Sequence, residues 1–460
     1  MKNVYYFSIA FLITIIAANG QLSKETIQQI DHYLNQEFKP DEPGVIIRIN
    51  QNDQKIYEKA IGLANIEKGA PLQTAMVFPI ASMSKQFTAI AILQLYEQRK
   101  LALTDEIQKY IPSFPRKENP ITIHHLLSMS SGIPEYFDVE DHETYLITKE
   151  YKQQEILHLF EDSPLLFKPE NKWSYSNSNY FLLGMIIEKV SGLTYGEYLE
   201  EHFFKPLQMT DSYYWFTPEI SKNRLATGYR QKKGAYSPTF PNHKIHSSTV
   251  FSAGGILSTM EDLNKWNTGL QNNTVLKKKT LKKAYTSYKL LNNDLNPYSY
   301  GFFIEDFYGN KVIRHGGDLF GVATNGLFYP KQNTYISIYA NSEFKDTKTI
   351  VYDLLHFVTE KPLPYKTIKL KPETLKKYIG TYTFATKPTR ILKLTLNNEL
   401  LYASISDHHP DVVLKLDAID EFHFVHKASK ALFKFILNAN NKVIKIEVDQ
   451  DGIYYWNKID

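Results

Sequence analysis

The chain has 460 residues, of which 22% are charged and 43% hydrophobic, with a formal net charge of +4. This length predicts about two or three domains and a large core. Because 53 basic residues nearly balance 49 acidic ones, the composition gives no support to nucleic-acid binding, which needs a strongly basic surface. The chain contains no cysteine, which excludes disulfides and lipid attachment through a cysteine.

Residues 1–20 are typical of an export signal. Lys2 supplies a positive charge, and an apolar run follows from Val4 to Ile16. Ala18-Asn19-Gly20 provides small residues of the kind that a signal peptidase reads. A membrane anchor is the alternative, but the run is shorter than the roughly 20 residues of a spanning helix. We therefore expect a periplasmic or secreted protein with no stable membrane span after cleavage.

The following segments predict a helix and then a hairpin. Apolar residues recur at helical spacing from Glu25 to Phe38. Gly44–Ile49 is typical of a strand, and Lys55–Tyr57 begins the return strand. Further short strands come late in the chain, at Tyr300–Ile304, Lys311–Arg314, Thr324–Tyr329 and Tyr335–Ala340. Helical segments lie between, so the pattern predicts an antiparallel sheet closed by both ends of one domain, with a separate helical lobe.

The pattern changes near residue 361. We expect a first domain over residues 21–360 and a linker over 361–372. Beyond the linker the period becomes two, with Leu392, Leu394 and Leu396 alternating with polar residues. Repeated short strands predict a small barrel or sandwich over residues 373–460. The whole chain is therefore expected to be of the α+β class.

Three short motifs occur in an order that indicates acyl-transfer chemistry. Ser82-Met83-Ser84-Lys85 opens a long apolar segment, Tyr175-Ser176-Asn177 follows, and His315-Gly316-Gly317 lies near the end of the first domain. Each motif alone is weak evidence, since Ser342-Glu343-Phe344-Lys345 also fits Ser-x-x-Lys. Together they describe a serine nucleophile, a lysine one helical turn away and a tyrosine–asparagine pair.

The surroundings of Ser82 favour a nucleophile. The run from Phe87 to Leu95 is apolar nearly all round, which predicts a buried helix. Lys85 lies three residues after Ser82, on the same helical face. Burial would help this lysine to lose its proton, and the helix N-terminus would favour a developing oxyanion. The alternative is that Ser82 only caps the helix and that Lys85 is solvated.

The segments around the motifs resemble the serine β-lactamase and penicillin-binding-protein superfamily, in its class C-like branch. The resemblance is carried by Phe78–Thr88, Ile121–Ile133, Phe167–Pro169 with Trp173–Tyr180, Ser252–Leu263, and Arg314–Gly317 with Gly321. It implies a sheet and a helical lobe with the active site between them. Residues 375–382 resemble part of the lipocalin-like β-domain that often follows such hydrolases.

The resemblance also implies roles for individual residues. Ser82 would be the nucleophile, and Lys85 and Tyr175 would move its proton. Tyr175 would act as general base or proton relay, helped by the positive charge of Lys85. Asn177 would orient Lys85 and the substrate. Glu170 departs from the family pattern, since many relatives have glycine there.

The third motif is expected to govern substrate preference. The backbone amides of Ser82 and Asp318 would form an oxyanion hole, beside Gly317 and His315. β-Lactamases have Lys-Thr-Gly or Lys-Ser-Gly here, which grips the carboxylate of the drug, whereas this chain has His315 and Gly316. Histidine is largely neutral at pH 7, so we expect esters to be better substrates than β-lactams. Protonation of His315 below about pH 6 would partly restore carboxylate binding.

These observations predict an exported serine hydrolase that forms an acyl-enzyme on Ser82 with a small ester, amide or peptide. An esterase or a D-amino-acid or peptide amidase is the first expectation, and a true β-lactamase or DD-peptidase is the alternative. A non-hydrolytic acyl sensor or cell-envelope binding module is an alternative from another class. No metal or organic cofactor is implied, and the oligomeric state stays open.

Overall fold

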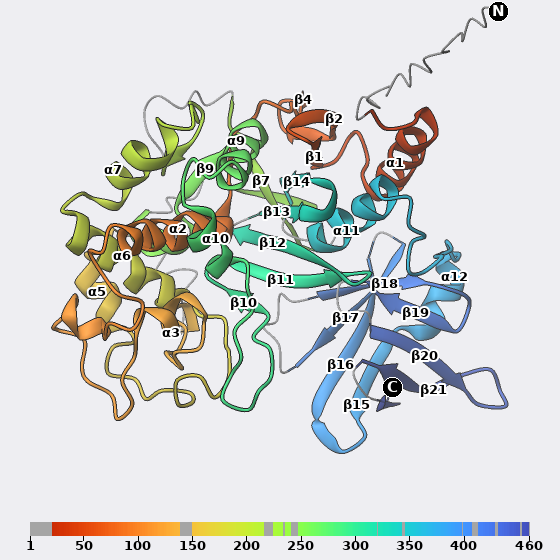
Figure 1. Ribbon diagram of the computed structural model, residues 1–460. Coiled ribbons are helices and arrows are strands. Elements are labelled where there is room, and N and C mark those ends of the chain that lie inside the picture. The colour runs from red at the N-terminus through yellow and green to blue at the C-terminus, as the bar shows by residue number, and fades with distance from the viewer. Residues whose placement is uncertain are drawn as a thin grey trace, which may run out of the picture.

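The computed structural model describes residues 21–138, 150–215, 224–232, 235–240, 247–319, 321–342, 346–397, 399–406, 413–427, 431–450 and 453–459. The predicted export signal lies outside these ranges. Figure 1 shows two parts, a sheet with a helical lobe and, at the C-terminal end, a β-barrel. The predicted α+β class is confirmed.

A seven-stranded antiparallel sheet, in the order β10-β11-β12-β13-β14-β1-β2, forms the centre of the first part. Its early hairpin, β1 (Val45–Gln51) and β2 (Gln54–Ile61), pairs with the late strand β14 (Thr334–Ala340). The expectation of a sheet closed by both ends of the domain is therefore confirmed. The other strands are β10 (Tyr298–Ser299), β11 (Phe302–Phe307), β12 (Asn310–Leu319) and β13 (Val322–Tyr329).

Both faces of the sheet are covered. Ile47 and Ile49 of β1 lie in a core cluster with residues of α1 (Lys24–Glu37) and α11 (Thr347–Val358). Ile46 points to the opposite face and joins the larger core of the helical lobe. Alternate residues of a strand face opposite sides, so burial of both faces explains why β1 begins with three consecutive apolar residues, Val45, Ile46 and Ile47.

The helical lobe is built around α2 (Ser84–Glu97), which packs against α6 (Asn177–Ser191) and α8 (Ser247–Gly254). Most of α2 is buried, as its all-round apolar character predicts. The first part also contains the helices α3 (Ile123–Leu127), α5 (Gln153–His158), α7 (Tyr195–Leu199), α9 (Met260–Gln271) and α10 (Lys278–Ala284). The short strands are β3 (Leu63–Asn65), β4 (Ala70–Pro71), β5 (Phe78–Pro79), β6 (Tyr213–Tyr214), β7 (Gly228–Lys232), β8 (Ala235–Phe240) and β9 (Ile256–Ser258).

The C-terminal part is a closed eight-stranded barrel, β15 to β22. A barrel, rather than a sandwich, is therefore what the alternating pattern specifies. The last strand lacks the alternating pattern, because Ile453 and Tyr454 are exposed and Trp456 is its buried residue. The strands are β15 (Gly380–Phe384), β16 (Lys387–Asn397), β17 (Leu400–Ile405), β18 (Val413–Ala418), β19 (His423–His426), β20 (Ala431–Leu437), β21 (Val443–Asp449) and β22 (Ile453–Lys458). The short helix α12 (Pro372–Leu375) precedes them, and the proposed linker at 361–372 stays a prediction.

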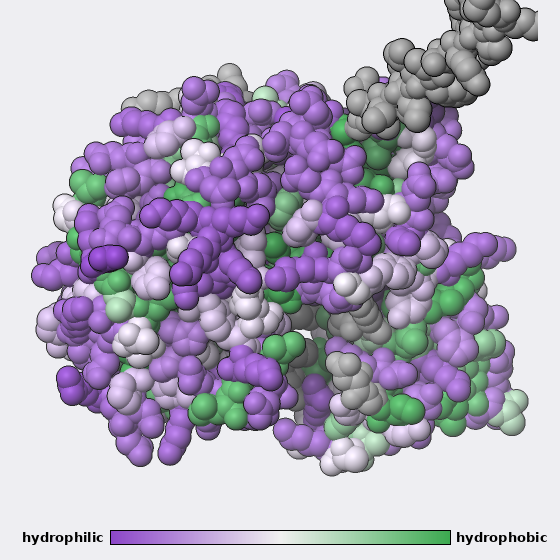
Figure 2. Space-filling model, in the orientation of Figure 1, coloured by the Kyte–Doolittle hydropathy of each residue, from purple (hydrophilic) through white to green (hydrophobic). Residues whose placement is uncertain are grey.

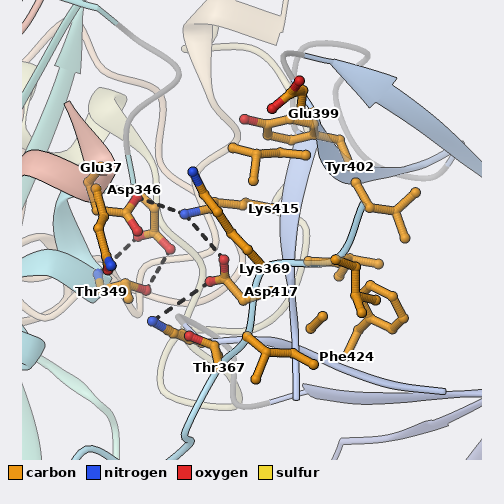
Figure 3. Close-up of a pocket in the computed structure, with 18 of the residues that line it drawn as sticks. Glu37, Asp346, Thr349, Thr367, Lys369, Glu399, Tyr402, Lys415, Asp417 and Phe424 are labelled. Atoms are coloured by element: carbon orange, nitrogen blue, oxygen red, sulfur yellow. Dashed lines mark hydrogen bonds and ion pairs between the residues drawn. The ribbon is translucent and has the colours of Figure 1, made fainter. Parts of the chain in front are cut away.

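Ion pairs join the barrel to the first part. Lys415 of β18 lies 2.7 Å from Glu37, at the end of α1, and 3.2 Å from Asp417. Lys427, just after β19, lies 3.4 Å from Asp353 of α11. Glu37, Lys415, Asp417 and Lys427 line a cavity of about 270 Å³, and Figure 3 shows Lys415 reaching toward its carboxylate partners there. Burial lowers the pKa of Lys415, but the two carboxylates outweigh it and raise the pKa above its usual value.

The surface seen in Figure 2 is largely hydrophilic, with scattered hydrophobic residues. In the part of the chain that the structure describes, no helix combines the length and the apolar character needed to cross a bilayer.

Candidate active site

Ser82 lies at a sharp turn between a strand and a helix. β5 leads into a single 3-10 turn, η1 (Ala81–Met83), which continues directly into α2. Ala81 has a positive φ of 48°, which is unusual for a residue with a side chain. The amide of Ile80 donates to the carbonyl of Ile256 at 2.9 Å and anchors the turn. This turn places Ser82 at the N-terminal end of a buried helix.

Lys85 lies one turn further on and is completely buried. Its Nζ is 3.0 Å from Ser82 Oγ, 2.6 Å from Asn177 Oδ1 and 2.7 Å from the carbonyl oxygen of Ala253. Burial lowers the pKa of Lys85 to about 7, and the negative charge of Glu135 opposes this shift. A neutral amine has two N–H donors and one lone pair. The two carbonyl oxygens can take the donors, which leaves the lone pair for the hydroxyl proton of Ser82.

Tyr175 and Asn177 flank the start of α6. A hydrogen bond with Ser82 lowers the pKa of Tyr175, but burial is the larger effect and raises that pKa above 10. Lys85 Nζ lies 5.0 Å from the centre of the Tyr175 ring. At neutral pH Tyr175 is therefore a phenol that can pass a proton on, whereas the pKa of Lys85 suits a base.

Glu135 belongs to this cluster, although the motif analysis missed it. Its Oε2 accepts hydrogen bonds from the backbone amide of Asn177 at 2.6 Å and from Asn177 Nδ2 at 2.9 Å. Its Oε1 accepts from the backbone amide of Phe137 at 3.1 Å. The signal in the sequence is its place two residues after Ile133, where the segment that carries the family resemblance ends.

The third motif continues β12 toward Ser82. The sequence predicts a strand over Lys311–Arg314, but β12 extends to Leu319. Its residues Ile313 to Leu319 all pair with β13. A Cβ atom added to Gly317 would lie 2.8 Å from the backbone nitrogen of Ser82 and 2.4 Å from the carbonyl oxygen of Ile80. Because Gly317 has no side chain, β12 can approach the turn that carries Ser82. Asp318 follows with an exposed side chain, opposite Ala323 in the strand pair.

His315 is present beside the site but cannot act as the sequence analysis expects. Its Nδ1 lies 2.6 Å from the carbonyl oxygen of Gly316, to which it donates, so Nε2 accepts from the Tyr298 hydroxyl at 3.0 Å. Burial lowers the pKa of His315 to about 3, with a further contribution from the charge of Lys85. The expectation that His315 gains a proton below about pH 6 is therefore wrong, because burial opposes its charging.

The arginine next to the motif is already paired. Arg314 Nε lies 2.8 Å from Glu305 Oε2, and the arginine side chain is buried. Burial raises the pKa of Glu305, but Arg314 outweighs this effect, and the pKa is about 2. Neither Arg314 nor neutral His315 is thus available to bind a substrate carboxylate.

Glu170 occupies its unusual position in a left-handed conformation, with φ of 66°. Glycine adopts this conformation without strain, which fits the glycine expected here from the family resemblance. The Glu170 carboxylate lies 3.4 Å from His124 and 3.6 Å from His125. These contacts hold the loop that precedes Tyr175 against α3.

The family model described as Beta-lactamase matches residues 25–357. The chain belongs to the Beta-lactamase family. This agrees with the serine β-lactamase and penicillin-binding-protein resemblance drawn from its motifs.

Within and around this family the chain is similar to proteins of several kinds. It is 25% identical over 408 residues to penicillin-binding protein 4* of Bacillus subtilis strain 168, covering 84% of this chain and 88% of that protein. The structure of an octameric penicillin-binding protein homologue from Pyrococcus abyssi matches with a TM-score of 0.68 and 24% identity, over 94% of this chain and 100% of that one. D-amino acid amidase from Ochrobactrum anthropi SV3 matches with a TM-score of 0.61 and 22% identity, over 73% of this chain and 98% of that one. At these identities the two structures establish the fold.

The structure of this Beta-lactamase family member brings the predicted residues into one cluster. Ser82, Lys85 and Asn177 are joined by hydrogen bonds, and Tyr175 interacts with Ser82. Gly317 lies against the Ser82 backbone. His315 lies behind Tyr175, with 6.3 Å between ring centres. Ser342, from the competing Ser-x-x-Lys motif, is buried beyond the end of β14.

Proposed function

We propose that this protein is an exported serine hydrolase that forms an acyl-enzyme on Ser82, with esters or D-amino-acid and peptide amides as substrates. The observation that carries the proposal is the environment of Lys85. Its Nζ lies 3.0 Å from the Ser82 hydroxyl, and two carbonyl oxygens occupy its other contacts. A lysine with a pKa of about 7 can accept a hydroxyl proton at neutral pH.

In the proposed reaction, Ser82 Oγ attacks the carbonyl carbon of the substrate while its proton moves to Lys85 Nζ. The carbonyl oxygen becomes an oxyanion, stabilised by the backbone amides of Ser82 and Asp318. As the tetrahedral intermediate collapses, the Tyr175 phenol gives its proton to the leaving oxygen or nitrogen and regains one from Lys85. Water then attacks the acyl-enzyme, and the same groups return the proton to Ser82.

The substrate preference follows from the third motif. Neutral His315 and paired Arg314 supply no free cation for a carboxylate, which favours neutral esters and amides. Similarity to a D-amino acid amidase supports the amide option. Similarity to penicillin-binding protein 4* supports a DD-peptidase or a β-lactam-binding protein as the second candidate.

Intact-protein mass spectrometry tests the proposal directly. The protein would be incubated with a fluorophosphonate, an aryl ester, D-phenylalanine amide and a penicillin. We expect one fluorophosphonate adduct, lost in Ser82→Ala and kept in Ser342→Ala, which removes the serine of the competing motif. We also expect turnover of the ester or the amide. Labelling that survives Ser82→Ala would refute the nucleophile, and a stable acyl adduct without turnover would identify a sensor.

Export is part of the same proposal and rests on residues 1–20. A fusion that carries these residues should be cleaved and leave the cytoplasm, and retention of the uncleaved chain would contradict it.

A further inference from the structure

We propose that Glu135 is a positioning residue for this reaction, which holds the Asn177 amide toward Lys85 and keeps a negative charge behind the lysine. The proposal rests on the acyl-enzyme function proposed for Ser82. In other nucleophile–base pairs a third group orients the base, and Glu135 would have this role for Lys85.

The hydrogen bonds of Glu135 determine which way Asn177 faces. A carboxylate is only an acceptor, and Oε2 receives both the backbone N–H and the Nδ2 of Asn177. The amide group of asparagine is nearly symmetric in shape, so packing alone would not distinguish its oxygen from its nitrogen. Because Glu135 takes the nitrogen, Oδ1 must face Lys85, where it lies 2.6 Å from Nζ. If the Asn177 amide were reversed, its Nδ2 group would face Lys85 Nζ, and two hydrogen-bond donors would meet.

The charge of Glu135 acts in the same direction. Burial is the largest influence and raises the pKa of Glu135 above its usual value, although three hydrogen-bond donors and the positive charge of Lys85 favour its ionised form. Within the described residues, the charged and titratable groups around Glu135 are Lys85 from α2, Tyr175 before α6, and Tyr136 and Asp138 from its own loop. Of these, Lys85 is the group that becomes positive when Ser82 loses its proton. Glu135 therefore stabilises the charge that forms during acylation.

The inference predicts how the pH dependence changes in Glu135→Gln. Loss of the negative charge leaves burial of Lys85 less opposed, so its pKa falls. The lysine then becomes a free base at lower pH, and the acidic limb of the rate profile should move down by about 1 pH unit or more. The maximal rate should fall about tenfold or more, because glutamine has one oxygen for the three donors that Glu135 satisfies.

The experiment measures the rate of fluorophosphonate labelling of Ser82 between pH 5 and 9 in the full chain, so no natural substrate is needed. Glu135→Asp keeps the charge with a shorter reach, and its acidic limb should stay near that of the wild type while its rate falls. Glu197→Gln is the matched control. Glu197 is exposed and accepts a backbone N–H at 2.8 Å, from Thr194 at the start of α7. Its removal should leave the profile unchanged.

The outcomes separate this inference from the proposed function. An unlabelled Ser82 in the wild type refutes the acyl-enzyme function and, with it, the role of Glu135. Normal labelling with an unshifted profile in folded Glu135→Gln overturns the Glu135 role alone. If circular dichroism shows that Glu135→Gln does not fold, Glu135→Asp decides, and a wild-type rate in that variant overturns the proposal.

Discussion

The Nζ atom of Lys85 lies 3.0 Å from Ser82 Oγ, in surroundings that bring the lysine pKa to about 7. An ordinary lysine would be more than 99.9% protonated at that pH, given its usual pKa of about 10.4. The buried helix therefore converts a cation into a group that can exist in either state under physiological conditions.

The first prediction concerns the shared proton path. Lys85→Ala and Tyr175→Phe should each lower kcat/KM about 10²–10⁴-fold without unfolding the protein. The double variant should lose less than the product of the two losses, because groups that act as a unit are not additive. Steady-state kinetics on an aryl ester would measure this. Fully multiplicative losses would indicate two independent roles.

The wild-type rate should fall as the pH drops through about 7, where Lys85 takes up a proton. A profile that stays flat from pH 8 to pH 5 would exclude Lys85 as the base.

A second prediction concerns the contact between β12 and the nucleophile turn. In Gly317→Ala the new methyl group would lie 2.4 Å from the carbonyl oxygen of Ile80 and 2.8 Å from the nitrogen of Ser82. One of the two segments must move, and acylation should slow by about 10²-fold. In the control, Gly254→Ala, the methyl group meets its nearest neighbour at 3.4 Å, an ordinary contact distance. Equal labelling rates in both variants would show that the close approach is not needed.

A third prediction concerns stability in acid. Burial lowers the pKa of His125 to about 4 and that of His315 to about 3, below the value of about 6.5 expected in the unfolded chain. Between the folded-state and unfolded-state pKa values, these two histidines bind protons in the unfolded chain but stay neutral in the folded protein. The free energy of unfolding should therefore decline as the pH falls below about 6.5, with the loss continuing toward pH 3. Denaturant titrations at several pH values would measure the decline, and His125→Gln should make it shallower.

A fourth prediction concerns the junction between the barrel and the first part. Lys415→Met should remove the cation that lies 2.7 Å from Glu37 and 3.2 Å from Asp417, while Asp417 keeps its longer 3.8 Å contact to Lys427, and should destabilise the junction by about 3 kcal/mol. Lys434→Met is the matched control, because Lys434 is a barrel lysine whose contact to Glu447 is 4.0 Å long and exposed. That change should cost less than about 1 kcal/mol. Thermal unfolding and limited proteolysis within residues 361–372 would compare the two, and equal effects would argue against a structural role for the Lys415 pairs.

A fifth prediction concerns substrate charge. The relative rates for a neutral ester and for the matching substrate with a carboxylate should stay constant between about pH 6 and 5, where Lys85 is already protonated and His315 stays neutral. Competition assays at several pH values would report this ratio. A shift toward the carboxylate substrate below pH 6 would mean that His315 gains a proton after all.

Local patterns were enough to predict that Ser82, Lys85, Tyr175 and Asn177 belong together. Ser82 and Lys85 are one helical turn apart, so their contact follows from spacing alone. Glu135 escaped the motif analysis because its partner Asn177 lies 42 positions away, across a loop with no periodic pattern. The end of β12 was missed for a different reason, since glycine normally weakens a strand and here permits a tertiary contact.

In the first domain the sheet was predictable because its strands are buried and rich in β-branched and aromatic residues. In the barrel, β22 exposes Ile453 and Tyr454, so its pattern does not distinguish an inner face from an outer one. Pairing with β15 and β21 determines that strand, and such pairing is a property of the closed barrel.

The pairing of β1 with β14 also constrains how the chain can fold. Val45 lies opposite Ala340, so the first hairpin cannot gain its neighbour until most of the chain has been made. At about 5–20 residues per second, a ribosome would need roughly 15–60 s to synthesise the intervening segment. During that interval β1 exposes an unpaired edge, which is prone to aggregation. Contacts of such long sequence separation also slow folding. The β1–β14 pairing therefore favours folding of the sheet after synthesis, when both of its halves are available at once.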